Sequence, residues 1–396
     1  MKKNQNLNQK NLILSIESSC DDSSLAITDI DSCALIYHRK ISQESAHNAY
    51  GGVVPEIASR LHSQSLPFVL ADLREFLTHR FDKQNPFSAV RAVAITTEPG
   101  LSVSLLQGLM MAKTLAQSLR VPIISINHLI GHFYSLFIDT KHIKIPMSVL
   151  LVSGGHTQIL EAHSKQDFRI VATSKDDSFG ECFDKIAKML NLGYPGGSII
   201  EQYALKYKKD FASKCDTHDI DGLSPLPLPL KHSKELAFSF SGLKNATRLL
   251  INSFLDSKSA KTSKISRTLN EKNSLSEIEI AHICASFQQT AIAHICDKLT
   301  RYFSTKSAQK NPIKTLGIIG GASANLALRS AVFKICERFG AELMLAPLEF
   351  CADNAAMIGR AGIEEYKKGN FSDIKSLEIS PRNECKILKN MTTNQM

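Results

Sequence analysis

The feature that most constrains the fold is an apolar strand that stops at a pair of glycines. Residues 147–152 read MSVLLV, residues 153–157 read SGGHT, and an apolar run then resumes. The first run is typical of a strand buried on both faces, and the break followed by a second run predicts a hairpin. Gly154 and Gly155 leave the backbone N–H groups accessible, so an anion can approach the main chain there. An ordinary hairpin turn is the alternative interpretation.

The same design recurs twice in the chain. Residues 12–17 (LILSIE) predict an apolar strand, which a small polar turn and a second strand follow. Residues 316–319 predict another apolar strand, which runs into the glycine-rich turn 320–325 and then into a helical pattern. Two strand–turn–strand units about 135 residues apart indicate an internal duplication. We therefore expect an α/β protein of the two-lobed actin-like ATPase fold, with duplicated RNase H-like lobes and a central ligand cleft.

Chain length agrees with two lobes. A chain of 396 residues is long for one hydrophobic core and suits two domains. We expect residues 1–146 to form the first actin-like lobe and residues 147–396 the second, with a final helix from about residue 353 as a candidate to pack back on the first. Residues 256–277 are dominated by Ser, Lys, Asn and Thr, which predicts a flexible excursion within the second lobe.

Composition excludes several classes of protein. The nine cysteines are scattered without a CxxC pair, so neither a zinc ribbon nor a disulfide framework is indicated. The first residues are polar and resemble no signal peptide, and no apolar run approaches the ~20 residues of a membrane span. We expect a cytoplasmic protein with no membrane association. The net charge of +9 leaves room for an anionic partner but does not identify one.

A histidine pair marks a candidate metal site. His128 and His132 follow the predicted strand 122–126 and are four residues apart, so on a helix they share one face and can bind one ion. Structural or surface histidines are the alternative. Asp353, which precedes an apolar helical pattern, is the best candidate for a third ligand. It could also be an N-cap residue, or serve in both roles.

Several carboxylates lie near the predicted turns. Asp184 and Glu201 flank glycine-rich segments, where paired carboxylates suit the hydroxyl groups of a ribose. Glu17 in the first turn could hold a metal-bound water or a substrate hydroxyl. Asn325 ends the third turn, where an adenine or a ribose could lie against bare backbone. Ordinary helix caps and solvated surface charges remain the alternative for the carboxylates.

Eight segments of the chain, taken together, resemble one family. In order they are IESSCDDSSLAI, GGVVPEIASRLHSQSL, NHLIGH, LLVSGGHTQ, GECFDKIAKMLNLGYPGG, FSFSGLK, GGASAN and CADNAAMIGRAG. They are similar to motifs of the tRNA N6-adenosine threonylcarbamoyltransferase family, and the resemblance runs from about Leu12 to Gly362. It implies transfer of a threonylcarbamoyl group from threonylcarbamoyl-AMP to N6 of adenosine 37 in tRNAs that read ANN codons, with release of AMP. It also implies an actin-like fold with one Fe²⁺ or Zn²⁺ per subunit.

The resemblance also implies roles for particular residues. The metal ligands would be His128, His132 and Asp353. The substrate-binding residues would be Leu151, Val152, Ser153, Gly154, Gly155, Asp184, Gly197, Asn325 and, on the ribose side, Glu201. One departure from the family pattern is Glu98, which stands where a small residue is usual and could alter the cleft mouth or a partner surface. None of the departures removes a proposed ligand.

The implied partners are tRNA, a smaller actin-like paralogue and a P-loop ATPase. The predicted helix 102–119 offers a surface for the paralogue, since Leu106 and Met110 are apolar while Gly108 and Ala112 keep one side thin. Its apolar residues nearly encircle it, so a wholly internal helix is the alternative.

Two other functions share parts of this pattern. A metalloprotease of the HExxH type would need a glutamate after His128, and the chain has Leu129 there. An actin-fold ATPase or small-molecule kinase would share the three turns. It would need a carboxylate at the γ-phosphate and would not need the histidine pair with Asp353.

Overall fold

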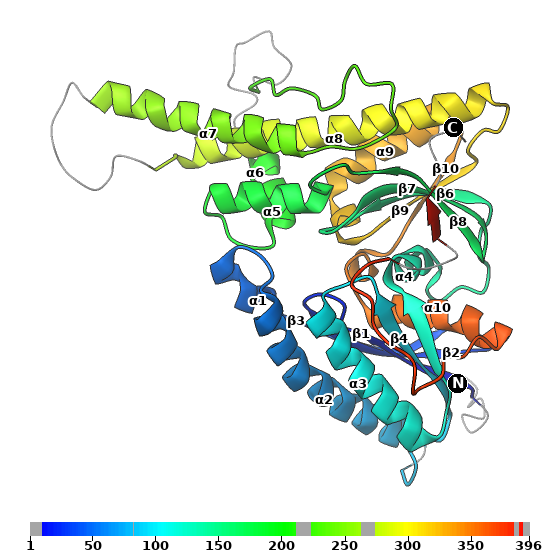
Figure 1. The fold of residues 1–396 in the computed structure, drawn as a ribbon. Coiled ribbons are helices and arrows are strands. Elements are labelled where there is room, and N and C mark those ends of the chain that lie inside the picture. Colours follow the sequence, from blue (N-terminus) through cyan, green and yellow to red (C-terminus); the bar gives the residue numbers. More distant parts are fainter. Residues whose placement is uncertain (1–9, 82, 211–222, 263–273, 384–387, 391–396) are drawn as a thin grey trace, which may run out of the picture. The chain divides into compact units, whose positions relative to one another are not determined.

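A computed structural model describes residues 10–81, 83–210, 223–262, 274–383 and 388–390 (Figure 1). The chain divides into two compact units. Unit 1 comprises residues 1–149, 162–169 and 344–390, and unit 2 comprises residues 150–161, 170–343 and 391–396. None of the helices in the described part is both long and apolar enough to cross a bilayer. The boundary of the lobes at residue 147 stays a prediction.

Unit 1 is built around a five-stranded sheet in the order β3-β2-β1-β4-β5. Strand β1 pairs antiparallel with β2 and parallel with β4. The strands are β1 (Leu12–Glu17), β2 (Asp22–Asp29), β3 (Leu35–Ser42), β4 (Val90–Glu98) and β5 (Ile123–Asn127). The helices are α1 (Glu44–His47), η2 (Asn48–Tyr50), α2 (Pro55–Arg80), α3 (Ser102–Leu119), α4 (His128–Tyr134), η3 (Ser135–Phe137), η7 (Leu348–Phe350) and α10 (Ala355–Lys368).

The two faces of this sheet are covered by different helices, as the alternation of side chains along β1 requires. Leu12, Leu14 and Ile16 belong to the core cluster formed with α2 and α3. Ser15, on the opposite face, donates a hydrogen bond to the carbonyl of Ala355 at the start of α10. Two glycines of α10 allow this close approach, because a Cβ at Gly359 would come within 2.8 Å of Ser15 Oγ. Glu17 has the same parity as Ser15 and so points to the face covered by α10.

The second sheet has six strands in the order β10-β9-β6-β7-β8-β11. Numbered along each half of the chain, β8-β7-β6-β9-β10 repeats the third-second-first-fourth-fifth order of the first sheet, and this repeated topology confirms the predicted duplication. The strands are β6 (Met147–Val152), β7 (Thr157–Ser164), β8 (Asp167–Thr173), β9 (Thr315–Ile319), β10 (Glu342–Leu345) and β11 (Leu388–Asn390). The helices of unit 2 are α5 (Phe179–Met189), α6 (Gly196–Asp210), α7 (Ser241–Thr262), α8 (Glu277–Ala308), η6 (Gly321–Ala324) and α9 (Leu326–Phe339).

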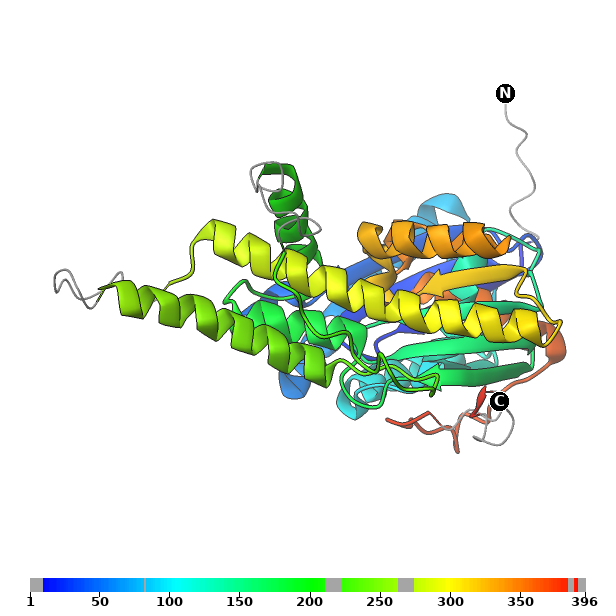
Figure 2. The ribbon, with the colours of Figure 1, turned by 90° about the horizontal axis from the view of Figure 1, so that it is seen from above.

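The core of unit 2 combines side chains of strands and helices, and its buried aromatic members come from α5, α8 and the loop that precedes α7. The ring of Phe183 in α5 packs tilted against that of Phe179, with centroids 4.6 Å apart, and meets Phe287 of α8 edge-on at 4.8 Å. Helices α7 and α8 lie side by side over much of their length (Figure 2). This packing holds the apolar face of α5. It thereby fixes the position of the N-terminus of α5, where Ser178 is the N-cap.

Two predictions about helices need correction. The excursion expected at 256–277 is wrong at its start, because α7 continues to Thr262; residues 263–273 lie outside the described residues. A polar composition opposes burial but not helix formation, and Lys and Ala favour it. The prediction that the small-residue side of α3 faces outward, toward a partner, is also wrong. Gly108 faces inward, and a Cβ there would lie 2.3 Å from Ser18 Oγ.

The turn after β9 requires glycine. Gly320 has φ of +89°, and a Cβ there would lie 2.4 Å from the carbonyl oxygen of Val152. Gly340, which ends α9 with φ of +67°, has no atom of the described residues within 4 Å of that position. We expect Gly340→Ala to lower the free energy of unfolding by about 1–2 kcal/mol, the cost of a left-handed residue. Gly320→Ala adds a backbone clash and should lose about 1–3 kcal/mol more.

Urea unfolding of the wild type and both variants measures this difference, provided that the slope with denaturant is unchanged. Equal losses for the two variants would show that the approach of Gly320 to Val152 does not constrain the turn.

Candidate metal centre and glycine-rich turns

The histidine pair lies on α4, directly after β5. Asn127, the last residue of β5, caps this helix: its Oδ1 accepts hydrogen bonds from the backbone N–H groups of Leu129 (2.9 Å) and Ile130 (3.2 Å). The spacing predicted from the sequence is confirmed, since the rings of His128 and His132 lie on one face with centroids 4.5 Å apart. Both side chains are buried.

Asp353 comes to this pair from the other end of unit 1. Its Oδ1 lies 3.3 Å from His128 Nε2 and 3.2 Å from His132 Nε2. The N-cap of α10 is Asn354, whose Oδ1 accepts from the N–H of Met357. The capping alternative for Asp353 is therefore wrong, and its carboxylate is free of that role. Because α10 packs on both β1 and α4, it holds Asp353 over the two imidazoles.

The three side chains fit a metal ion. Their ligand atoms all lie within 4.8 Å of one another. A tetrahedral ion with bonds of about 2.0–2.1 Å places its ligand atoms about 3.3–3.4 Å apart, which matches the two distances to Asp353 Oδ1. Among the described residues, neither ring nitrogen of buried His132 makes a hydrogen bond of good geometry. A buried polar atom of this kind is a signal of a missing ligand.

A second carboxylate orients His128 from behind. Glu17 Oε2 lies 3.3 Å from His128 Nδ1, and Ser19 Oγ lies 3.2 Å from the same atom. Glu17 is fixed in turn by the hydroxyl of Thr96 and by the N–H of Ser19. A proton on Nδ1 leaves Nε2 free to bind metal, which is the usual arrangement of a metal-binding histidine and its carboxylate. The sequence placed Glu17 in a turn, whereas the structure buries it at the end of β1.

The electrostatics of this cluster favour positive charge between its carboxylates. Burial lowers the pKa of His128, but the carboxylates of Asp353 and Glu17 outweigh it and hold that pKa well above its usual value. Burial and the neighbouring His128 lower the pKa of His132, so its imidazole is neutral, as a ligand must be. Burial opposes ionisation of Asp353, yet the two imidazoles keep its pKa well below the usual range. A divalent cation would satisfy the same charge balance.

In unit 2, the SGG turn is braced by the N-terminus of α5. Ser178 Oγ donates to the carbonyl of Gly154 at 2.6 Å, and the N–H of Gly180 donates to the carbonyl of Ser153. Gly180 is required, because a Cβ there would lie 2.6 Å from Ser153 O. Gly155 is open instead: no described atom lies within 4 Å of its Cβ position. The predicted turn therefore has one closely packed side and one accessible side.

Of the other predicted substrate residues, Leu151 and Val152 end β6, and the rest lie in the same unit on α5, α6 and the start of α9. Asp184 accepts a hydrogen bond from the N–H of Gly196 at 2.8 Å, while Gly197 is as open as Gly155. Glu201 accepts from the N–H of Leu326 at the start of α9. Asn325 caps that helix through Oδ1 and donates from Nδ2 to Gln288.

These side chains therefore brace the turns that leave Gly155 and Gly197 open. The supporting glycines, Gly180, Gly196 and Gly320, were not singled out from the sequence as site residues. Each would place a Cβ less than 3 Å from a carbonyl oxygen. Their only signal in the sequence is that each lies in or beside a predicted glycine-rich segment.

Known proteins that are similar to this chain belong to one family. Residues 34–360 match the family described as tRNA N6-adenosine threonylcarbamoyltransferase. A protein of that name from Wolinella succinogenes is 51% identical over 371 residues, which cover 94% of this chain and 98% of the relative. One from Helicobacter pylori J99 is 52% identical over 379 residues, which cover 96% and 99%. The crystal structure of HypF from T. kodakarensis matches with a TM-score of 0.51 at 12% identity, covering 92% of this chain and 49% of the other. Together with the duplicated topology, it confirms the predicted two-lobed actin-like ATPase fold.

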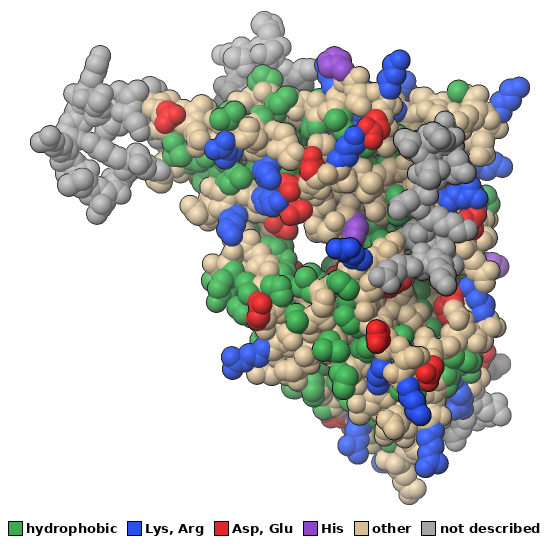
Figure 3. Space-filling view, in the orientation of Figure 1, with side chains coloured by type: hydrophobic (Ala, Val, Ile, Leu, Met, Phe, Trp, Pro, Cys, Tyr) green, Lys and Arg blue, Asp and Glu red, His purple; other side chains and the backbone are tan. Residues whose placement is uncertain are grey.

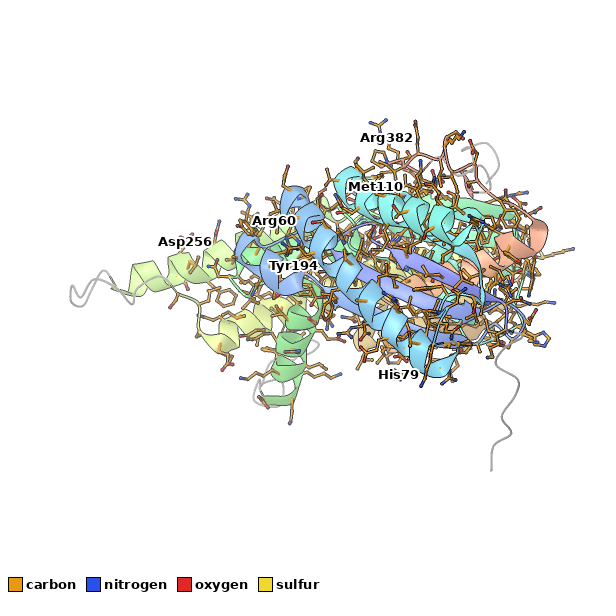
Figure 4. The ribbon with its side chains drawn as sticks, turned by 90° about the horizontal axis from the view of Figure 1, so that it is seen from below. Arg60, His79, Met110, Tyr194, Asp256 and Arg382 are labelled. Atoms are coloured by element: carbon orange, nitrogen blue, oxygen red, sulfur yellow. The ribbon has the colours of Figure 1, made fainter. Side chains whose placement is uncertain are left out.

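The metal site is tested by removing one ligand. We expect the purified chain to carry about one Fe or Zn, and His132→Ala to lose most of it, because two remaining protein ligands bind an ion weakly. His79→Ala, at an exposed side chain near the end of α2 (Figure 4), is the matched control and should keep the wild-type content. Metal analysis of both variants decides the question. Equal content in His132→Ala and wild type would exclude this site.

Proposed function

The chain belongs to the tRNA N6-adenosine threonylcarbamoyltransferase family, and we propose that its donor is threonylcarbamoyl-AMP and its acceptor N6 of adenosine 37 in tRNAs that read ANN codons. It is a transferase that forms N6-threonylcarbamoyladenosine in tRNA. We propose further that AMP is released and that the reaction takes place in the cytoplasm. The observation that carries it is the convergence of His128, His132 and Asp353 within a chain that matches this family over most of its length.

The metal proposed for this site is one Fe²⁺ or Zn²⁺. His128 and His132 would bind it through Nε2 and Asp353 through Oδ1, while Glu17 keeps the proton of His128 on Nδ1. Two imidazoles and a carboxylate leave coordination positions for substrate oxygens. A bound dication supplies Lewis acidity and positive charge toward those oxygens.

The proposed adenylate site comprises the glycine-rich turns of unit 2. Its residues are Leu151, Val152, Ser153, Gly154, Gly155, Asp184, Gly197, Glu201 and Asn325. Gly155 and Gly197 offer backbone without a side chain above it, which suits the approach of a phosphate or a ribose. Asp184, Glu201 and Asn325 support this surface by holding neighbouring N–H groups, so part of their contribution is to the shape of the turns.

The reaction does not require a nucleophilic side chain from the protein. The carbamic–phosphoric mixed anhydride of the donor is already activated, with AMP as a good leaving group. The protein must hold the carbonyl carbon near the exocyclic amine, stabilise the developing oxyanion and exclude water. The metal centre of unit 1 would stabilise the oxyanion, and the exposed backbone of the turns in unit 2 would bind the phosphate of the adenylate. The acceptor base must be unstacked from its loop to be reached.

The alternative functions fit less well. A HExxH metalloprotease needs a general base beside His128, and the second helical residue is Leu129. A kinase or ATPase would need the turns but gives no reason for two imidazoles and a carboxylate in contact.

We also propose that the chain works with a smaller actin-like paralogue and a P-loop ATPase, and that α3 contacts the paralogue. Leu105 and Leu109 are buried, but Val103, Leu106 and Met110 are 40%, 45% and 56% exposed on the outer side of α3. Hydrophobic side chains gather over α2 and α3 in Figure 3, and Met110 lies on this surface in Figure 4. An exposed apolar stripe of this kind suits a partner helix. Gly108 does not contribute to this partner surface, because it faces the core.

The donor site is tested by AMP release from synthetic threonylcarbamoyl-AMP in the presence of tRNA. We expect Gly155→Val to abolish adenylate binding in calorimetry and to reduce AMP release at least tenfold, because its side chain occupies the open side of the turn. Gly242→Val changes an equally open glycine in α7 and is the control. A folded Gly155→Val protein with wild-type adenylate affinity would show that the SGG turn is only a hairpin.

The partner surface is tested by adding charge to α3. We expect Met110→Glu to weaken binding to the purified paralogue by about tenfold or more, since a carboxylate replaces an apolar contact. Ser118→Glu adds the same charge at another exposed position of α3 and should bind normally. Full turnover by the isolated chain would contradict the need for a partner, and normal binding by Met110→Glu would exclude this helix.

A further inference from the structure

The segment after α10 returns to the strand ends that carry the metal centre. The N–H of Ser372 donates to the carbonyl of Ile123 in β5, and Ile374, Leu377 and Ile379 pack on the core beneath α2 and α3. The N–H of Ser380 then donates to the carbonyl of Thr97 in β4 at 2.9 Å. We name residues 372–383 the C-terminal strap. It is anchored in unit 1 by backbone hydrogen bonds and by the apolar side chains of Ile374, Leu377 and Ile379.

The strap ends on the residue that caps the metal-binding helix. Asn127 Nδ2 donates to Asn383 Oδ1 at 2.8 Å and to Glu98 Oε1 at 3.2 Å. Its Oδ1 is the atom that accepts from Leu129 and Ile130. All four partners of this buried amide are therefore in place, two acceptors on the nitrogen side and two donors on the oxygen side.

This arrangement permits only one orientation of the Asn127 amide. A rotation by 180° would set Oδ1 against two acceptor oxygens and Nδ2 against two backbone N–H groups. Unsatisfied buried polar groups cost about 1–3 kcal/mol each, so the rotated state is excluded while Glu98 and Asn383 are present. The two backbone N–H groups already favour this orientation, and removing Glu98 and Asn383 leaves Nδ2 without both of its acceptors. The first residue that depends on the cap is His128.

We propose that Glu98 and Asn383 are positioning residues of the metal centre, which act through Asn127 to hold α4 in the orientation where His128 and His132 meet Asp353. The inference rests on the metal site proposed above. It assigns a role to the C-terminal strap: the same segment of chain that presents Asp353 at the start of α10 continues through the strap to fix the helix of the two histidines. One continuous segment of chain therefore positions both Asp353 and the helix that carries the two histidines. Partners outside the ligand set of a metal site commonly alter affinity by 10–100-fold.

The test measures Zn²⁺ affinity of the full-length protein by chelator competition and the visible spectrum of the Co²⁺-substituted protein. We expect Asn383→Ala to weaken Zn²⁺ binding about tenfold and to change the Co²⁺ absorption bands. Arg382→Ala is the control, since Arg382 is the exposed neighbour labelled in Figure 4, and it should match the wild type. Glu98→Gln retains an acceptor oxygen and should bind Zn²⁺ more tightly than Glu98→Ala.

A double-mutant cycle separates positioning from general support of the fold. Asn127→Ser keeps a capping oxygen for the N–H groups of Leu129 and Ile130, but its shorter side chain carries no amide that reaches Asn383. In that background Asn383→Ala should cause no further loss of affinity, because the coupling is already broken. Equal losses in both backgrounds, or wild-type Zn²⁺ binding by Asn383→Ala, would overturn the inference. Wild-type Zn²⁺ binding by His132→Ala would instead overturn the metal site itself.

Discussion

The interaction on which the candidate site depends is the contact of one carboxylate oxygen with two imidazoles. Asp353 Oδ1 lies 3.3 Å and 3.2 Å from the Nε2 atoms of His128 and His132. Two buried imidazoles and a partly buried carboxylate in contact are unfavourable unless their charges are balanced. Glu17 behind His128 adds a second carboxylate to the same cluster. The structure of unit 1 is organised to bring these groups together, since Glu17 ends β1, the histidines follow β5, and α10 covers the sheet face between them.

A second constraint is the division of labour among the glycines of unit 2. Gly180, Gly196 and Gly320 are packed so closely against carbonyl oxygens that a Cβ would clash. Gly154, Gly155 and Gly197 have no described atom within 4 Å of a Cβ position. The first group of glycines lets neighbouring helices and turns pack closely together. The second group leaves the backbone of the turns uncovered by side chains. The two properties together make a surface that a phosphate can contact, while either property alone would make only a tight turn.

Local patterns were enough to predict part of this structure. The strand ends, the duplication and the histidine pair follow from periodicity and spacing, because they depend on residues close in sequence. Asp353 was found as a polar residue before an apolar helix, but its neighbour Asn354 proved to be the cap. The role of Glu17 depends on which face of β1 it occupies, and that register is set by pairing with β2 and β4. The prediction placed Gly108 on the wrong side of α3. Apolar residues lie on nearly every side of this helix, so the sequence pattern does not show which side faces the core. The bond between Asn127 and Asn383 joins distant segments and leaves no local signal.

The central claim is that His128, His132 and Asp353 bind a catalytic metal ion, and its most direct test is anomalous diffraction from crystals of the purified protein at the absorption edge of the metal it contains. The account predicts one strong peak at about 2.0–2.2 Å from Nε2 of each histidine and from a carboxylate oxygen of Asp353. A peak at any other place in the chain, in protein that carries a stoichiometric metal, would contradict it.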